Sequence, residues 1–115
     1  MKTPRNPWVY VDYVVESVRF IRQYTSTVSR EKFLKDHQVQ DAVIRRFQVM
    51  GDAAKSVPQE FKNRFPEIPW REMMTQRDVI VHDYFDINFE RLWETVQNDL
   101  PSLDQKLAKI LEQKQ

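Results

Sequence analysis

Apolar residues recur along the chain at the spacing of three and four that is typical of helices burying one face. The pattern predicts four main helices, over residues 7–24, 38–55, 69–83 and 88–111. The last is expected to kink or restart at Pro101, because proline has no N–H for the helical ladder. The stripe of the first helix shows the pattern clearly and consists of Trp8, Val11, Val15, Val18 and Ile21.

Capping residues and prolines indicate where these helices begin. Asn6 is a favoured N-cap, and Pro7 suits the first helical position. Asn88 is a similar N-cap for the last helix, and Ser29 is expected to cap a short helical turn. Residues 58–65 are expected to form another short turn, followed by a connection that the two prolines at 66 and 69 enforce.

Gly51, the single glycine of the chain, lies inside the second predicted helix beside two alanines. Glycine costs about 1 kcal/mol relative to alanine in a helix. No glycine-rich loop surrounds it, so a phosphate-binding loop is not expected. The simple interpretation is the close approach of a neighbouring helix.

Short connections between amphipathic helices predict an all-α fold, an antiparallel bundle of four to five helices forming one domain over residues 1–115. The absence of cysteine excludes a disulfide framework, a thiolate metal site and a cysteine nucleophile. No segment has the length and apolar content of a membrane span, and no signal-peptide core is found, so we expect a cytoplasmic protein.

The formal net charge of +1 gives the chain no global basic field for nucleic acid. Solvated helix faces are the simple interpretation of its cations. A local RNA-contacting patch is the alternative, and it would be built partly from Arg19, Arg22, Arg30, Lys32 and Lys35.

Residues 77–84 gather the side chains best suited to chemistry. Arg77 can hold a phosphate, and His82 can move protons near neutral pH. Asp78, four residues before His82, is placed to orient the imidazole or to raise its proton affinity. The other histidine, His37, has the polar surroundings of a surface residue. No His or Glu pair has metal-ligand spacing, so neither a metal nor another cofactor is expected.

Helix geometry separates the two main candidates. Arg77 and His82 differ by about 140° around a helix axis and by about 7.5 Å along it. They are therefore not close neighbours, and a second copy related by a two-fold axis would supply the other half of a site. Arg77 and Tyr84 differ by only about 20°, so they share a stripe if the helix continues.

A purely structural interpretation of the same residues stays open. Arg77 would then form surface ion pairs with Glu72, Asp78 or a neighbouring helix. His82 would be a helix-end histidine stabilised by the helix dipole. Tyr84 would be a core aromatic residue with its hydroxyl at the rim.

Several segments of the chain, in order, resemble one family. They are residues 40–45, 50–55, 66–71, 77–85 and 98–101, together with Trp93 and Val96. Residues 77–85 contain Arg77, His82 and Tyr84 at the spacing Arg-x4-His-x-Tyr. In these features the chain resembles the HepT-like ribonuclease toxins of the HEPN superfamily.

The resemblance implies a helical bundle that dimerises through the motif helix and cleaves RNA without metal. Arg77 and His82 would be catalytic, and Asp78 would support them. The partner would be an MntA-type nucleotidyltransferase antitoxin that transfers AMP onto Tyr84. The chain departs from the family at Asp83, where a small residue is usual, and this carboxylate would repel RNA or tune His82.

Two other functions remain open at this point. The first alternative is a non-catalytic helical subunit that docks a nucleotidyltransferase. The low net charge and Asp83 favour it. The second alternative is an adaptor bundle unrelated to this superfamily. The sequence does not identify the RNA that is cut.

Overall fold

The structure is a computed structural model that describes residues 5–114. Its elements in chain order are α1 (Pro7–Thr25), α2 (Arg30–Phe33), α3 (His37–Ser56), α4 (Gln59–Arg64), α5 (Trp70–His82), the 3₁₀ turn η1 (Tyr84–Asp86), α6 (Phe89–Glu94), the π-helical turn η2 (Thr95–Asp99) and α7 (Leu100–Leu111). No strand occurs in the described range, which confirms the expected all-α fold. None of the helices found between residues 5 and 114 combines the length and apolar character required to cross a membrane.

The predicted helix starts are confirmed by the caps. The Asn6 side chain accepts a hydrogen bond from the backbone N–H of Trp8 at 3.0 Å, and Pro7 begins α1. Asn88 caps α6 in the same way, and Ser29 caps α2. Each such cap stabilises its helix by about 1 kcal/mol because it satisfies an otherwise unpaired backbone donor.

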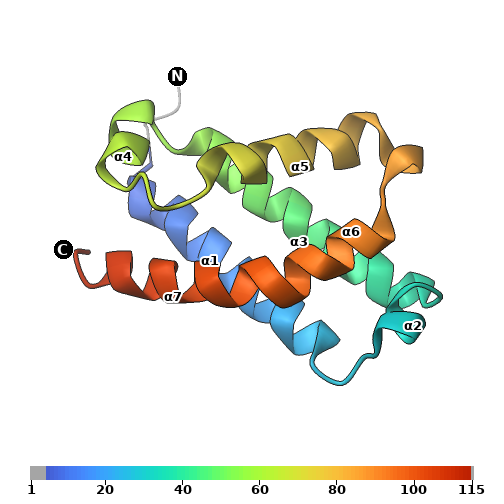
Figure 1. Cartoon of the computed structure of the whole chain (residues 1–115). Coiled ribbons are helices and arrows are strands. Elements are labelled where there is room, and N and C mark those ends of the chain that lie inside the picture. The colour runs from blue at the N-terminus through green and yellow to red at the C-terminus, as the bar shows by residue number, and fades with distance from the viewer. Residues whose placement is uncertain (1–4, 115) are drawn as a thin grey trace.

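Helix α3 is the centre of the bundle. It packs along α1 on one side and along α5 on the other, and α7 packs on α1 (Figure 1). The expected apolar stripe of α1 is buried in this core. Because α3 contacts both neighbours, its residues set where α5 lies, and α5 carries the sequence motif.

The last helical segment is interrupted next to Pro101, as predicted. Pro101 lies in the first turn of α7, and the backbone just before it adopts the wider π-helical turn η2. Pro101 has no N–H to donate to the carbonyl four residues earlier, so the ladder changes its register there.

Gly51 marks the close approach of two helices, as predicted. A Cβ atom at this position would overlap the Cβ of Arg77 and would lie 2.7 Å from the Met73 carbonyl oxygen. The approaching helix is therefore α5, and its contact with the glycine is made by the motif arginine itself.

Candidate active site

Arg77 is held between two carboxylates. Its Nε donates a hydrogen bond to Asp52 Oδ1 on α3 at 2.6 Å, and its Nη1 donates one to Asp78 Oδ1 at 3.1 Å. The two hydrogen bonds raise the pKa of Arg77, the bond to Asp52 contributing most. The side chain is 24% exposed. A guanidinium has five N–H donors, so these bonds fix its plane and leave donors for an anionic ligand.

Lys55 extends this arrangement along α3. Its Nζ lies 2.9 Å from the same Oδ1 of Asp78 that Arg77 contacts. Hydrogen bonds from Lys55 and Arg77 lower the pKa of Asp78, and the bond from Lys55 contributes most. Asp52, Lys55, Arg77 and Asp78 thus form one ion-pair network between α3 and α5, called the α3–α5 network below.

The network depends on the local sequence of α3. Gly51 removes the side chain that would hold α5 away, and Asp52, the next residue, places its carboxylate on Arg77. Lys55 is three residues further, so it lies on a similar face of α3. A purely structural role of Arg77 also predicts ion pairs with Asp78 and with a neighbouring helix, and both are present.

His82 is the last residue of α5 and is exposed. The expected orientation of its imidazole by Asp78 is not observed, and Arg77 and Lys55 both contact Asp78 Oδ1 instead. Within residues 5–114, no hydrogen bond joins Asp78 to His82. Arg77 and His82 are separated along the helix, as the sequence predicts, by about 7.5 Å of axial rise.

Tyr84 lies outside the helix, which corrects the expectation of a stripe shared with Arg77. Helix α5 ends at His82, because Asp83 has a φ of −128° and leaves the helical region. Tyr84 belongs to the 3₁₀ turn η1 and is 49% exposed, so it is not a core aromatic residue. Its hydroxyl therefore belongs to a surface residue just beyond His82.

Exposed apolar side chains surround this end of α5. Phe85 is 98% exposed, Val81 is also exposed, and the Phe85 ring lies 5.9 Å from the Tyr84 ring, edge to face. We call Val81, Tyr84 and Phe85 the apolar end of α5. A fully exposed phenylalanine beside other apolar groups is typical of a surface that another molecule covers.

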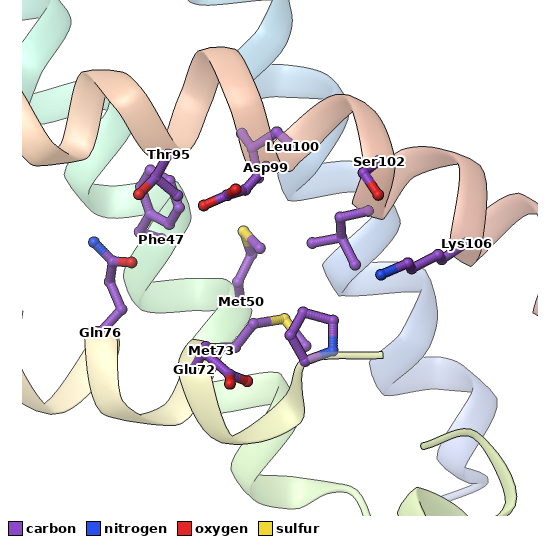
Figure 2. Close-up of a pocket in the computed structure, with 12 residues that line it drawn as sticks. Phe47, Met50, Glu72, Met73, Gln76, Thr95, Asp99, Leu100, Ser102 and Lys106 are labelled. Carbon is purple, nitrogen blue, oxygen red and sulfur yellow. The ribbon is translucent and has the colours of Figure 1, made fainter. Parts of the chain in front are cut away.

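A pocket of about 300 Å³ lies between α3, α5 and the η2–α7 segment (Figure 2). Its apolar part includes Phe47, Met50 and Met73, and its polar part includes Gln76 and Asp99. None of Arg77, Asp78, His82 and Tyr84 lines it. The pocket is therefore separate from the motif.

Metal ligands are not gathered anywhere in the described residues. No group of three or more His, Asp or Glu side chains between residues 5 and 114 is arranged to hold a metal ion. The motif instead offers a fixed guanidinium, an exposed imidazole and a phenol, which are groups for phosphate binding and proton transfer.

Sequence reasoning missed two members of the network. Asp52 and Lys55 were assigned no role, although both lie within four residues of the glycine that predicts a close helix approach. An acidic residue directly after such a glycine is a usable signal, because its side chain must lie near the approaching helix. The partner of Asp52 could not be read from the sequence.

Comparisons with known proteins agree with the motif. The "Ribonuclease HepT-like" family matches residues 14–110. A protein of Thermococcus cleftensis, named "Probable ribonuclease HepT", is 42% identical over 101 residues, which cover 88% of this chain and 92% of the relative. A protein of Caldanaerobacter subterraneus, provisionally named an RNase, is 32% identical over 112 residues, which cover 97% of each chain.

A longer relative comes from Methanocaldococcus jannaschii. It is 35% identical over 105 residues, which cover 91% of this chain and 47% of that protein, whose name combines a gamma-glutamylcyclotransferase with a provisional RNase. No solved structure matches the chain significantly. With a family match over most of its length and full-length relatives above 30% identity, the chain belongs to the HepT-like ribonuclease family.

Proposed function

We propose that this protein is the toxin of a type VII (HEPN/MNT) toxin–antitoxin system and acts as a metal-independent endoribonuclease on cellular RNA, either tRNA or mRNA. The observation that carries the proposal is the fixed guanidinium of Arg77 on the same helix as the exposed His82, in a chain of the HepT-like family. The names of the relatives point to RNA as the substrate.

The chemistry follows from the two side chains. His82, as general base, takes the proton of a ribose 2′-hydroxyl, and that oxygen attacks the adjacent phosphorus. The bond from phosphorus to the 5′-oxygen breaks, and this oxygen leaves with a proton, for which a histidine is also suited. Arg77 stabilises the negative charge that builds on the phosphorane oxygens. Asp78 supports the site by holding Arg77.

A homodimer completes the site in this proposal. Arg77 and His82 are about 7.5 Å apart along the axis of α5 and about 140° apart around it, so a two-fold axis beside α5 would bring the motif helices of two copies together. The apolar end of α5 supports this arrangement, since pairing would cover Phe85 and Val81. The antitoxin would add to this dimer as a larger hetero-oligomer.

Regulation in this proposal acts at Tyr84. The nucleotidyltransferase antitoxin transfers AMP from ATP to the phenolic oxygen and releases pyrophosphate. Tyr84 is half exposed and lies two residues after His82, which makes it accessible to such an enzyme. A bulky anion there would repel RNA from His82.

The second candidate is a non-catalytic subunit that docks a nucleotidyltransferase. The almost fully exposed Phe85 favours it, because a docking surface also needs uncovered apolar groups. In that case His82 has no catalytic role, whereas the apolar end of α5 is still the docking surface.

Growth after induced expression separates the two candidates. We expect the wild type to arrest cells, His82→Ala to lose toxicity, and His37→Ala to stay toxic. His37 is a matched control because it is the other histidine and is exposed at the start of α3. Arrest by a folded His82→Ala protein equal to that by wild type would rule out the ribonuclease mechanism.

A further inference from the structure

Lys62 on α4 is a buried lysine with no acidic partner. It is 9% exposed, and its Nζ donates to the Met74 sulfur at 3.4 Å. Within residues 5–114, no carboxylate lies at ion-pair distance from it. A thioether is a weak acceptor, and an ammonium has three donors. Burial, followed by the nearby charge of Lys55, lowers the pKa of Lys62.

The surroundings of Lys62 leave room for an anion. Lys62 lines a hollow of about 700 Å³ formed by α4, the following connection and the start of α5. Arg71 and Met74 line the same hollow, and so do the carboxylate side chains Glu67 and Glu72. A buried cation without a paired charge costs free energy, and a bound anion would offset that cost.

The cations form a row along one face of α5. Met74, Asp78 and His82 follow each other at intervals of four residues, so they share this face. Lys62 contacts Met74, and both Lys55 and Arg77 contact Asp78. The row therefore runs from Lys62 through Lys55 and Arg77 towards the histidine.

The length of this row suits a nucleic-acid strand. Met74 and His82 are separated by about 12 Å along the helix axis. One strand of a duplex carries a phosphate about every 3.4 Å of axis, so the row spans roughly two to four phosphates. Lys55 and Arg77 face the carboxylates of Asp52 and Asp78, whereas Lys62 has no carboxylate at ion-pair distance among the described residues, so Lys62 is the cation of the row without a paired charge.

We propose that Lys62 and Lys55 bind backbone phosphates of the RNA strand that is cut at Arg77 and His82. This rests on the proposed ribonuclease function. Contacts to phosphates fix the register of a strand and do not read its bases. The row would thus position the scissile phosphate for His82 without selecting a base sequence.

The test measures RNA binding against salt in the His82→Ala background, where no cleavage occurs. The probe is a short, unstructured, fluorescein-labelled RNA of mixed sequence, and its dissociation constant is followed by anisotropy. Each phosphate contact contributes about 0.7 to the slope of log Kd against log salt for a single strand. Lys62→Met and Lys55→Gln should each lower the slope by about 0.7.

Two controls make the result specific. Lys62→Arg keeps the charge and should keep the slope, which also reports whether the site tolerates substitution. Lys109→Gln removes the same charge from an exposed position on α7, which packs on α1, and should leave the slope unchanged (Figure 1).

The outcomes separate this inference from the proposed function. If the parent protein binds RNA and the slopes of Lys62→Met and Lys55→Gln equal its own, the phosphate row is wrong and the ribonuclease proposal stands. Equal reductions in Lys109→Gln would also overturn it. If the parent does not bind RNA at all, the proposed function fails and takes this inference with it.

Discussion

Asp52 Oδ1 accepts a hydrogen bond from Nε of Arg77 at 2.6 Å, and the residue directly before Asp52 is the glycine on which Arg77 packs. Two adjacent residues of α3 therefore fix both the distance of α5 and the plane of its arginine. The carboxylate of Asp78 holds the guanidinium from a second side. An arginine restrained in this way can present its remaining donors to a phosphate without first being ordered.

Replacing Asp52 tests this restraint. Asp52→Ala should lower kcat for RNA cleavage by roughly ten- to a hundredfold, because a misplaced guanidinium stabilises the transition state poorly. RNA should bind at least as tightly, since a negative charge near the phosphate is removed. Kinetics and binding are compared with Asp41→Ala, an exposed acidic residue of the same helix. An unchanged or higher kcat would mean that Asp52 only competes with RNA for Arg77.

Gly51→Ala should destabilise the fold although alanine is the better helix former. The helical preference of alanine contributes about 1 kcal/mol in its favour. Overlap with Arg77 should outweigh this, since overpacking costs about 1–3 kcal/mol. Urea unfolding should therefore give a lower free energy of unfolding, whereas the exposed Arg45→Ala on α3 should change it by less than about 0.5 kcal/mol. A Gly51→Ala protein more stable than wild type would show that the helices move apart freely.

The free energy of unfolding at acidic pH should depend on the protonation of Asp78. Its pKa is lowered in the folded protein by Lys55 and then by Arg77, so it stabilises the fold above its unfolded pKa of about 3.9. This contribution is lost as the pH falls through the folded value. The urea midpoint of Asp78→Asn should consequently fall less steeply below about pH 4. Asp41→Asn is the control, and equal steepness in Asp78→Asn and wild type would contradict the network.

Tyr84 should be the acceptor of AMP. Incubation with the nucleotidyltransferase partner and ATP should raise the intact mass of the wild type by adenylate units. Tyr84→Phe should gain no mass, whereas Tyr13→Phe, which removes another exposed tyrosine, should behave like wild type. A mass gain in Tyr84→Phe equal to that of the wild type would place the modification elsewhere.

Much of the fold was readable from local signals. Asn6, Pro7 and Asn88 predicted helix starts because capping is decided within a few residues, and Pro101 predicted the break in the last segment. Gly51 predicted a close helix contact, because the approach of a neighbouring helix is the simple explanation of a glycine inside a helix, although the sequence did not identify that neighbour.

The site was less predictable because it depends on which helices pack together. The pairing of Asp52 with Arg77 joins residues that only the tertiary fold brings together. The expected orientation of His82 by Asp78 is not observed, and the contact of Lys55 with Asp78 likewise depends on how α3 packs on α5. Nothing in the sequence around Lys62 indicates burial, since a lysine in a short helix is ordinarily exposed.

The most direct measurement is cleavage of total RNA by the purified protein in EDTA, beside Arg77→Ala and His82→Ala proteins shown to be folded. Cleavage by the wild type alone is the predicted result, and it would establish a metal-independent ribonuclease that depends on both residues. Cleavage by the folded His82→Ala protein at the wild-type rate would contradict the account. So would the absence of cleavage by a wild-type protein whose intact mass shows that Tyr84 carries no adenylate.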